Sequence, residues 1–281
     1  MEPKLEEIRE QQKATWDKFS PGWKKWDEFT MNFLKPMGDA IITHLQLKNN
    51  DSILDVATGT GEPGLTIAAM VPQGKVTGQD LSDGMLKVAR EHAAQKGLKN
   101  YDTVSCDISA LPFQDSSFNG LSCRMGFMFF PDMEKAAREM VRVLKPSGRL
   151  ATSVWGGPAN NFWITAMMGA IGKNMEMPAP PPGSPGMFRC AQPGLIADLL
   201  RKAGLRNVTE TDVSGFVEYP SIENYWQMMN EVAAPVVAAM GKATGETKMK
   251  IKDDLTATLK DRLKTDGLAL PFTSIIVKGE K

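Results

Sequence analysis

Three carboxylates follow short apolar runs at regular intervals in the first half of this 281-residue chain. Asp55 ends the run "SILD", Asp80 ends "KVTGQD" and Asp107 ends "YDTVSCD". A turn with Gly59 and Gly61 follows the first of them. Because parallel strands end at one edge of a sheet, where open α/β sheets bind ligands, we expect these residues to form one ligand site.

The turn "GTGEPG" fits the Gly-x-Gly-x-x-Gly pattern that holds the pyrophosphate of dinucleotides in many proteins. Asp55, four positions before Gly59, and Glu62, inside the turn, argue against an anionic ligand. Two like charges about 4 Å apart repel by about 4 kcal/mol at an effective dielectric constant of about 20. The sequence therefore favours a cationic ligand, and S-adenosylmethionine carries an ammonium, a sulfonium and no phosphate.

The other two carboxylates suit the rest of such a ligand. Asp80 can accept two hydrogen bonds from a ribose diol, with Leu81 and Met85 beside a flat base. Asp107 can accept a hydrogen bond from an exocyclic amine, with Ile108 on the ring face. A single aspartate at a strand end is more often a cap of the next turn. Three of them at successive strand ends indicate a ligand site.

Strands that alternate with helices position these residues. Apolar runs predict strands at 52–57, 75–80, 101–107, 118–125, 149–155, 207–219 and 270–281. Pro63 opens one intervening helix, and Ser82 caps the next, which Gly97 ends. This alternation predicts parallel β-α-β units with helices on both faces of the sheet.

The flanking segments predict a cap and a substrate region. Residues 4–19 are expected to form a helix that stops at "SPG", and residues 1–47 a helical cap. The main domain would span 48–281, with a substrate-cap insertion at about 156–192 and a helical segment at about 221–265. Within the latter, we expect 222–240 to be one helix, and we expect the Pro-rich stretch 177–186 to be a semi-rigid loop.

Composition excludes several classes of protein. The 33 basic and 33 acidic residues cancel, so no global field attracts nucleic acid. Two histidines and three widely spaced cysteines indicate neither a metal centre nor a disulfide framework. We therefore expect a cytoplasmic protein without metal, nucleic-acid partner or stable membrane insertion, acting as a monomer or homodimer on a small molecule.

With these motifs, the chain resembles the class I S-adenosylmethionine-dependent methyltransferases, most closely their ubiquinone/menaquinone-biosynthesis branch. The matching stretches are "ILDVATGTGEPG", "VTGQDLSDGMLKVAR", "CDISALPFQDSSFNGLSC" and "EMVRVLKPSGRL", in the same order over residues 50–155. Two departures are Ala57, where the family often has Gly, and Asn119, where it usually has Asp. The resemblance implies a Rossmann-like α/β fold. Its seven-stranded sheet would have the order 3-2-1-4-5-7-6 with strand 7 antiparallel, helices on both faces and a helical N-terminal lid.

The resemblance also implies a site for S-adenosylmethionine, which leaves as S-adenosylhomocysteine, with no metal. We expect this cofactor to contact the glycine-rich turn, the ends of the second and third strands, and the residues after the fourth strand. The candidates are Asp55, Ala57, Thr58, Gly59, Gly61, Asp80, Leu81, Met85, Cys106, Asp107, Ile108, Arg124 and Met125.

The methyl acceptor is constrained less well. Arg124 is a candidate to stabilise an enolate or phenolate, or else to support the loop by a salt bridge, and His44 is a candidate base. Large apolar residues predict a hydrophobic or aromatic acceptor that is quinone-, phenol- or polyketide-like. The predicted pocket residues are Trp16, Phe19, Trp23, Met128, Phe129, Trp155 and Trp163.

Two other functions compete with methyl transfer. An NAD-dependent oxidoreductase would use the same turn, but the acids around it oppose a pyrophosphate. A non-catalytic binding module with a methyltransferase fold would not require Asp55, Gly59, Gly61 and Asp80 together. Binding of S-adenosylmethionine, of NAD or of neither distinguishes the three hypotheses.

Overall fold

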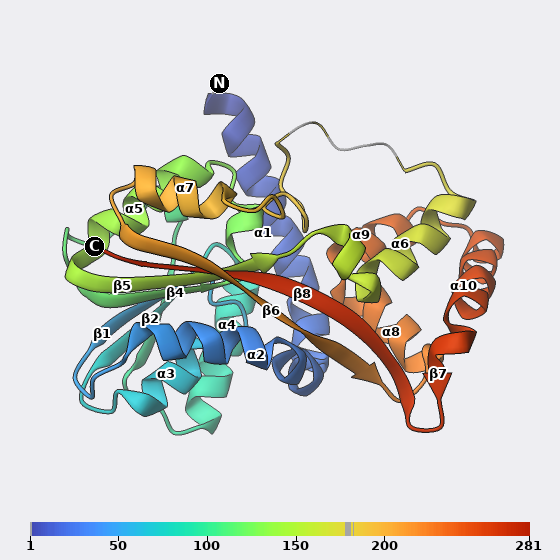
Figure 1. Ribbon diagram of the computed structural model, residues 1–281, viewed down its shortest axis with the longest axis horizontal. Helices are drawn as coiled ribbons and strands as arrows, with labels where there is room; N and C mark the ends of the chain where they lie inside the picture. Colours follow the sequence, from blue (N-terminus) through green and yellow to red (C-terminus); the bar gives the residue numbers. More distant parts are fainter. Residues whose placement is uncertain (1, 178–180, 182) are drawn as a thin grey trace. The chain divides into compact units, whose positions relative to one another are not determined.

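A computed structural model describes residues 2–177, 181 and 183–281 (Figure 1). The chain divides into two compact units. The first comprises Met1–Trp155, Pro185–Val213 and Ser274–Lys281, and the second Gly156–Ser184 and Ser214–Thr273. Residues 1–47 belong to the first unit, and the predicted insertion at 156–192 is divided between the two.

The sheet has the order β3-β2-β1-β4-β5-β8-β6, and β7 pairs with β8. The strands are β1 (Ser52–Val56), β2 (Lys75–Asp80), β3 (Tyr101–Ser105), β4 (Phe118–Arg124), β5 (Leu144–Trp155), β6 (Arg206–Tyr219), β7 (Leu263–Lys264) and β8 (Gly267–Glu280). Strands β1 to β5 pair in parallel, and β8 is antiparallel to β5. The predicted α/β class and strand order are confirmed; the two-residue β7 makes the closing strand the eighth instead of the seventh.

Helices of the first unit cover both faces of this sheet (Figure 1). Helices α2 (Asp27–Leu45), α3 (Gly64–Met70) and α4 (Asp83–Gln95) lie on one face, and α5 (Met133–Val143) and α7 (Leu195–Lys202) on the other. A continuous apolar core fills the first interface: Ile41, Leu45, Ile53, Leu65, Ile67, Val71, Val76, Ala89 and Tyr101. Since β1 is covered on both sides, four of its five residues are buried.

Helix α1 is longer than the sequence predicts. It runs from Glu2 to Lys25 through Ser20-Pro21-Gly22, where we expected it to stop. Pro21 has no N–H for the carbonyl of Asp17, but the Ser20 hydroxyl donates to that carbonyl at 2.9 Å. The helix also packs along α4. A local hydrogen bond and tertiary packing therefore offset the proline.

The second unit is mainly helical. It contains α6 (Phe162–Asn174), α8 (Ile222–Val232), α9 (Ala234–Met240) and α10 (Gly245–Leu259). The single helix expected over 222–240 is wrong, because the chain breaks at Ala233, ahead of Pro235. A proline near the start of a helix is favourable and inside one is not, so two helices form. Residues 178–180 and 182 of the Pro-rich stretch lie outside the described residues.

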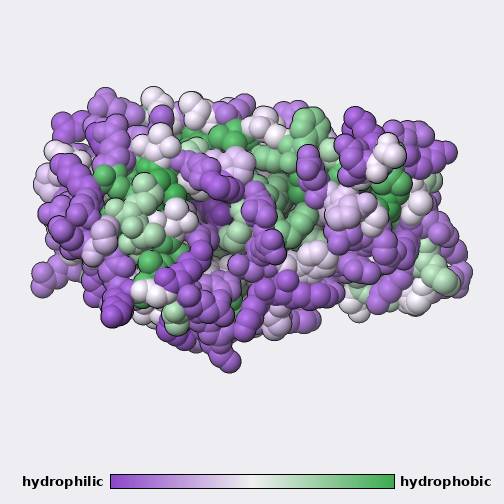
Figure 2. Space-filling model, turned by 90° about the horizontal axis from the view of Figure 1, so that it is seen from below, coloured by the Kyte–Doolittle hydropathy of each residue, from purple (hydrophilic) through white to green (hydrophobic). Residues whose placement is uncertain are grey.

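Short 3-10 helices connect these elements: η1 (Ile108–Ala110), η2 (Phe127–Phe129), η3 (Pro158–Asn160) and η4 (Lys260–Arg262). Figure 2 shows a face on which hydrophilic residues cover most of the surface and hydrophobic residues lie in patches between them. Among the helices in the described part of the chain, none is long and apolar enough to cross a bilayer.

Candidate active site

Asp55, near the end of β1, holds the glycine-rich turn from inside the protein. Its buried carboxylate accepts hydrogen bonds from the hydroxyls of Thr58 and Ser122, both at 2.6 Å, and from the Gly64 N–H at 3.1 Å. The Tyr101 hydroxyl lies 2.9 Å from the Thr58 hydroxyl and extends the network. Burial raises the pKa of Asp55 to about 6 against the effect of these hydrogen bonds. Asp55 therefore organises the turn, and any attraction that it exerts on a cation acts through space.

The turn itself has a left-handed backbone that borders open space. The φ angles are +51° at Ala57, +57° at Gly59 and +117° at Gly61. A Cβ on Gly61 would lie 2.6 Å from a methyl carbon of Leu65, so packing requires glycine there. A Cβ on Gly59 would meet nothing within 4 Å. Gly59 is therefore the point at which a ligand can approach the backbone closely.

Asp80, at the end of β2, faces the same turn. Its Oδ2 accepts from the Gly59 N–H at 2.9 Å, and its Oδ1 accepts from the Ser82 N–H at 2.9 Å. Burial raises the pKa of Asp80, and the nearby carboxylate of Asp17 raises it further. The Ser82 hydroxyl accepts from the Met85 N–H at 3.1 Å, which confirms Ser82 as the cap of α4. The Leu81 N–H also acts on this carboxylate, so one of its four lone-pair positions stays open to a further donor.

Asp107, just past the end of β3, makes two contacts within the protein. Its Oδ1 accepts from the Ser109 N–H at 2.9 Å and so caps η1. Its Oδ2 lies 2.6 Å from Nε of Arg9 on α1. Ile108 beside it is buried, and Cys106 is held by the bond from its N–H to the Asp80 carbonyl at 3.1 Å. Asp107 is thus both a cap and the partner of a cation on α1.

Helix α1 makes further polar contacts with the loop after β2. Lys13 donates to the carbonyl of Leu81 at 3.2 Å and pairs with the carboxylate of Asp83. Asp17 accepts from the Ser82 hydroxyl at 2.6 Å. These contacts hold α1 across the residues that the sequence assigns to a ribose and a base.

Comparison with known proteins identifies the region that carries these motifs. Residues 53–148 match a family described as a methyltransferase domain. This match places a methyltransferase domain within residues 53–148. The chain is 35% identical over 128 residues to the demethylmenaquinone methyltransferase of Listeria monocytogenes serotype 4a. The aligned region covers 45% of this chain and 49% of that protein. The chain thus spans about half the length of this curated relative.

Solved structures support the fold of the methyltransferase domain and its surroundings. A protein from Bacillus halodurans, named as a methyltransferase, superposes with a TM-score of 0.56 and 22% identity. The superposition covers 87% of this chain and 98% of that one. A phosphoethanolamine N-methyltransferase from Haemonchus contortus, solved with S-adenosyl-L-methionine, superposes with a TM-score of 0.54 and 16% identity. The superposition covers 87% of this chain and 52% of that one. At these identities the likeness is one of fold.

Arg124 ends β4 of the methyltransferase domain beside the turn. Its guanidinium donates to the Met31 sulfur at 3.1 Å. Burial lowers the pKa of Arg124, and the carboxylates of Asp55, Glu62 and Asp27 oppose that shift. Arginine stays charged under such conditions, so this cation faces carboxylates without a direct ion pair to any residue that the structure describes.

Aromatic residues of α1 and of the loop after β4 come together. The Trp16 ring lies 5.0 Å from that of Phe129 and 6.2 Å from each of Phe19 and Trp23, centroid to centroid. Met125 follows β4 with a φ of +61° and donates its N–H to the Ser153 carbonyl. The four rings, which the sequence predicts to line the substrate pocket, thus lie in one cluster.

The remaining predicted pocket residues lie in other surroundings. Met128 is fully buried, and Trp155 stacks on Phe33 with 5.7 Å between ring centroids. Trp163 belongs to the second unit, where its indole N–H donates to Asn161 at 3.1 Å. A contact of these three residues with an acceptor stays a prediction.

His44 does not lie near the turn. Its ring contacts the Gly279 carbonyl at 3.5 Å, and Gly279 pairs with Leu150, five residues before the carboxyl end of β5. Along α2, His44 lies 13 residues, or about 20 Å, beyond Met31, whose sulfur accepts from the Arg124 guanidinium. Strand β8 is also separated from β1 by β4 and β5. The hypothesis that His44 is the catalytic base is therefore wrong.

Sequence reasoning missed Gln79 and the role of Glu62. Gln79 accepts from the Ala57 N–H at 3.2 Å and donates to the Cys106 carbonyl at 2.6 Å, so it joins the first turn to the third. Glu62 accepts from the Thr66 N–H and hydroxyl and so caps α3 instead of facing a ligand. The sequence does carry a signal for Gln79, because a polar residue in a strand that is buried on both faces needs a partner.

Proposed function

We propose that this chain transfers the methyl group of S-adenosylmethionine to a small hydrophobic or aromatic acceptor. The observation that carries the proposal is the pairing of Asp80 with the backbone of Gly59. It sets a carboxylate with a lone pair open to a further donor beside a turn that is open to a ligand. A ribose diol matches the carboxylate, and the methionine portion matches the open turn.

The charges around the turn support this ligand over a dinucleotide. Asp55, Asp80 and Asp17 are all close to it. A pyrophosphate would face these carboxylates, whereas an ammonium and a sulfonium are attracted by them. The Haemonchus contortus structure, which holds S-adenosyl-L-methionine, has the same fold and adds support.

In this proposal the protein supplies alignment and electrostatics. When bound, S-adenosylmethionine would supply a methyl group that its sulfonium activates for transfer to the acceptor atom. Asp80 and the turn fix the adenosine and methionine ends, so that the reacting atoms are in line. Arg124 holds its charge close to Asp55 and stabilises an acceptor that has lost a proton, such as a phenolate or enolate.

The acceptor class follows from the aromatic residues and from the relative. Trp16, Phe19, Trp23 and Phe129 form a cluster on which a flat ring can pack. The Listeria relative is named for a menaquinone precursor, which is a quinone. We propose a quinone- or phenol-like ring, with polyketide-like acceptors as the wider class.

Helix α1 is proposed to act as the lid of this site. Arg9 occupies the Asp107 carboxylate that the sequence assigns to the adenine amine. Lys13 and Asp17 bind the loop beside Asp80. The helix must therefore shift when adenosine binds and must open to admit it, which is a gating step.

The test is transfer of a radiolabelled methyl group from S-adenosylmethionine to a panel of quinols, phenols and polyketide-like rings. Labelled product is expected with at least one ring, and the Arg124→Lys variant should transfer at least tenfold more slowly, because lysine lacks the planar guanidinium with its several N–H donors. Lys145→Arg is a matched control on β5. Cofactor binding without transfer to any acceptor would support the non-catalytic alternative.

A further inference from the structure

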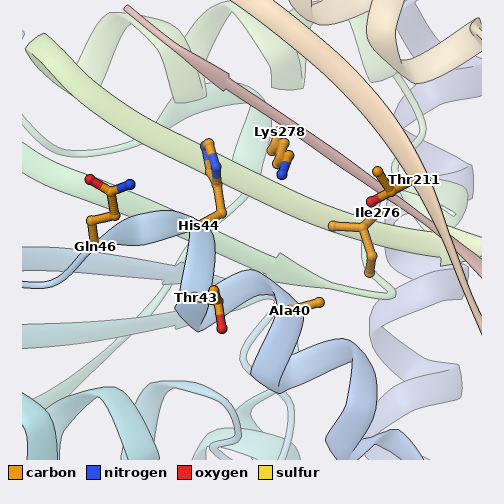
Figure 3. A pocket seen from close by; sticks show the side chains of 7 residues that line it. All are labelled: Ala40, Thr43, His44, Gln46, Thr211, Ile276 and Lys278. Carbon is orange, nitrogen blue, oxygen red and sulfur yellow. The ribbon is translucent and has the colours of Figure 1, made fainter.

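A pocket of about 350 Å³ lies on the first unit between the last turns of α2 and the strands β6 and β8 (Figure 3). Helix side chains line one wall and strand side chains the other: Ala40, Thr43, His44, Gln46, Thr211, Ile276 and Lys278. His44 in its wall lies 13 residues, or about 20 Å along α2, beyond Met31, whose sulfur accepts from Arg124. The pocket is therefore separate from the candidate active site.

The polar groups of this pocket are mostly hydrogen-bond donors. The Gln46 carbonyl oxygen is already taken by Arg149, which leaves the amide N–H groups for a ligand. The Lys278 ammonium makes no ion pair with any residue in the described part of the chain, and Thr211 contributes a hydroxyl. Among the described residues, no aspartate or glutamate lines the pocket. A set of donors without a carboxylate is suited to an anion.

The charged groups that face His44 also leave an excess of positive charge. They are Lys278, Arg149 and Glu280. Arg149 and Glu280 pair with each other at 3.2 Å, so Lys278 is left unbalanced. Burial lowers the pKa of His44, and the two cations lower it further, while the Gly279 carbonyl and Glu280 oppose them. An anion in the pocket would reverse the effect of these cations.

We propose that this pocket binds a small phosphate monoester dianion. Lys278 and a protonated His44 match its two charges, with Gln46 on one side of this pair and Thr211 on the other as further donors (Figure 3). The side chains of Ala40 and Ile276 offer an apolar wall for the carbon portion. A volume of about 350 Å³ is at the lower end of the range for ligand pockets and suits a small metabolite.

The pocket predicts a linkage between anion binding and protonation. An opposite charge within about 4–6 Å raises the pKa of a histidine by about one unit or more. The binding constant must change by the same factor, so the anion should bind about tenfold more tightly when His44 is protonated. Binding should therefore weaken as the pH rises through the pKa of His44 in the complex.

Proton NMR of the imidazole C2 protons tests this inference, because the chain has only two histidines. The probes are inorganic phosphate and glycerol 3-phosphate, titrated against sodium chloride at equal ionic strength. We expect the pKa of His44 to rise by about one unit, with saturation. Lys278→Met should abolish the rise, and Lys99→Met, an exposed lysine elsewhere, should retain it.

Three results would overturn the proposal. If sodium chloride moves His44 as far as phosphate does, only screening occurs and the pocket holds no anion. If Lys278→Met keeps the full effect in a protein whose thermal unfolding is unchanged, the pocket is not the site. We expect glycerol 3-phosphate to bind at least threefold more tightly than inorganic phosphate, and an equal or weaker binding would refute the assignment to a monoester.

Discussion

The buried carboxylate of Asp55 predicts a specific pH dependence of stability. In the unfolded chain an aspartate has a pKa of about 3.9, and burial raises that of Asp55 to about 6 in the folded protein. Because the folded state binds the proton more tightly, the contribution to stability is fully present below about pH 4 and is lost as the pH rises through about 6. A difference of about two units corresponds to about 3 kcal/mol.

Asp55→Asn is the perturbation that isolates this effect. The amide oxygen can accept from Thr58 and Gly64 as Oδ2 does now, and the amide nitrogen can donate to the Ser122 hydroxyl. The variant has no charge at this position to desolvate. Its free energy of unfolding should therefore lack the decrease of about 3 kcal/mol that the wild type shows between about pH 4 and pH 7.

Urea unfolding, followed by circular dichroism at half-unit pH steps, measures this difference directly. Asp102→Asn, an exposed aspartate on β3, is the matched control and should keep the pH dependence of the wild type. If Asp55→Asn has the same dependence as the wild type, the carboxylate is ionised in both states across this range, and the reasoning about its burial is refuted.

Two more predictions concern the turn and the helix above it. Arg9→Ala should free the Asp107 carboxylate and tighten the binding of S-adenosylmethionine by about two- to fivefold, as measured by calorimetry. This factor corresponds to the loss of a partly exposed ion pair. Weaker binding would instead make Arg9 a ligand of the cofactor. Ala57→Gly should raise the free energy of unfolding in urea by about 0.5 kcal/mol. Glycine removes the backbone strain of alanine at a φ of +51°, and this gain exceeds the added entropy of the unfolded chain. A loss of stability would contradict the strain assigned to Ala57.

The sheet could be predicted because its signals are local. Each strand end combines an apolar run with a turn, as in "SILDVATGTG", and the spacing of Asp55 and Asp80 fits one β-α-β step. The strand predicted over 75–80 has the same first and last residues as the observed β2. The cap at Ser82 followed from residue type alone, since its oxygen needs only the N–H of Met85.

The rest depends on contacts between distant segments. The sequence gives no sign that Arg9 reaches Asp107, about a hundred positions away, or that Ser122 donates to Asp55. The same holds for α1, whose passage through Pro21 rests on packing against α4. His44 was misassigned because a helix before β1 can end at either edge of the sheet, and only the fold decides which.

The central claim is that the turn and Asp80 hold an adenosyl cation and not a pyrophosphate, and calorimetric titration tests it most directly. The protein is titrated with S-adenosylmethionine, S-adenosylhomocysteine and NAD, with Asp80→Ala and Asp80→Asn as variants and Asp102→Ala as the matched control. We expect the first two ligands to bind and NAD not to. Both Asp80 variants should lose about 10- to 100-fold in affinity, the effect of lost hydrogen bonds to a charged group. Binding of NAD alone, or binding of S-adenosylmethionine that is unchanged without the Asp80 carboxylate, would contradict this account.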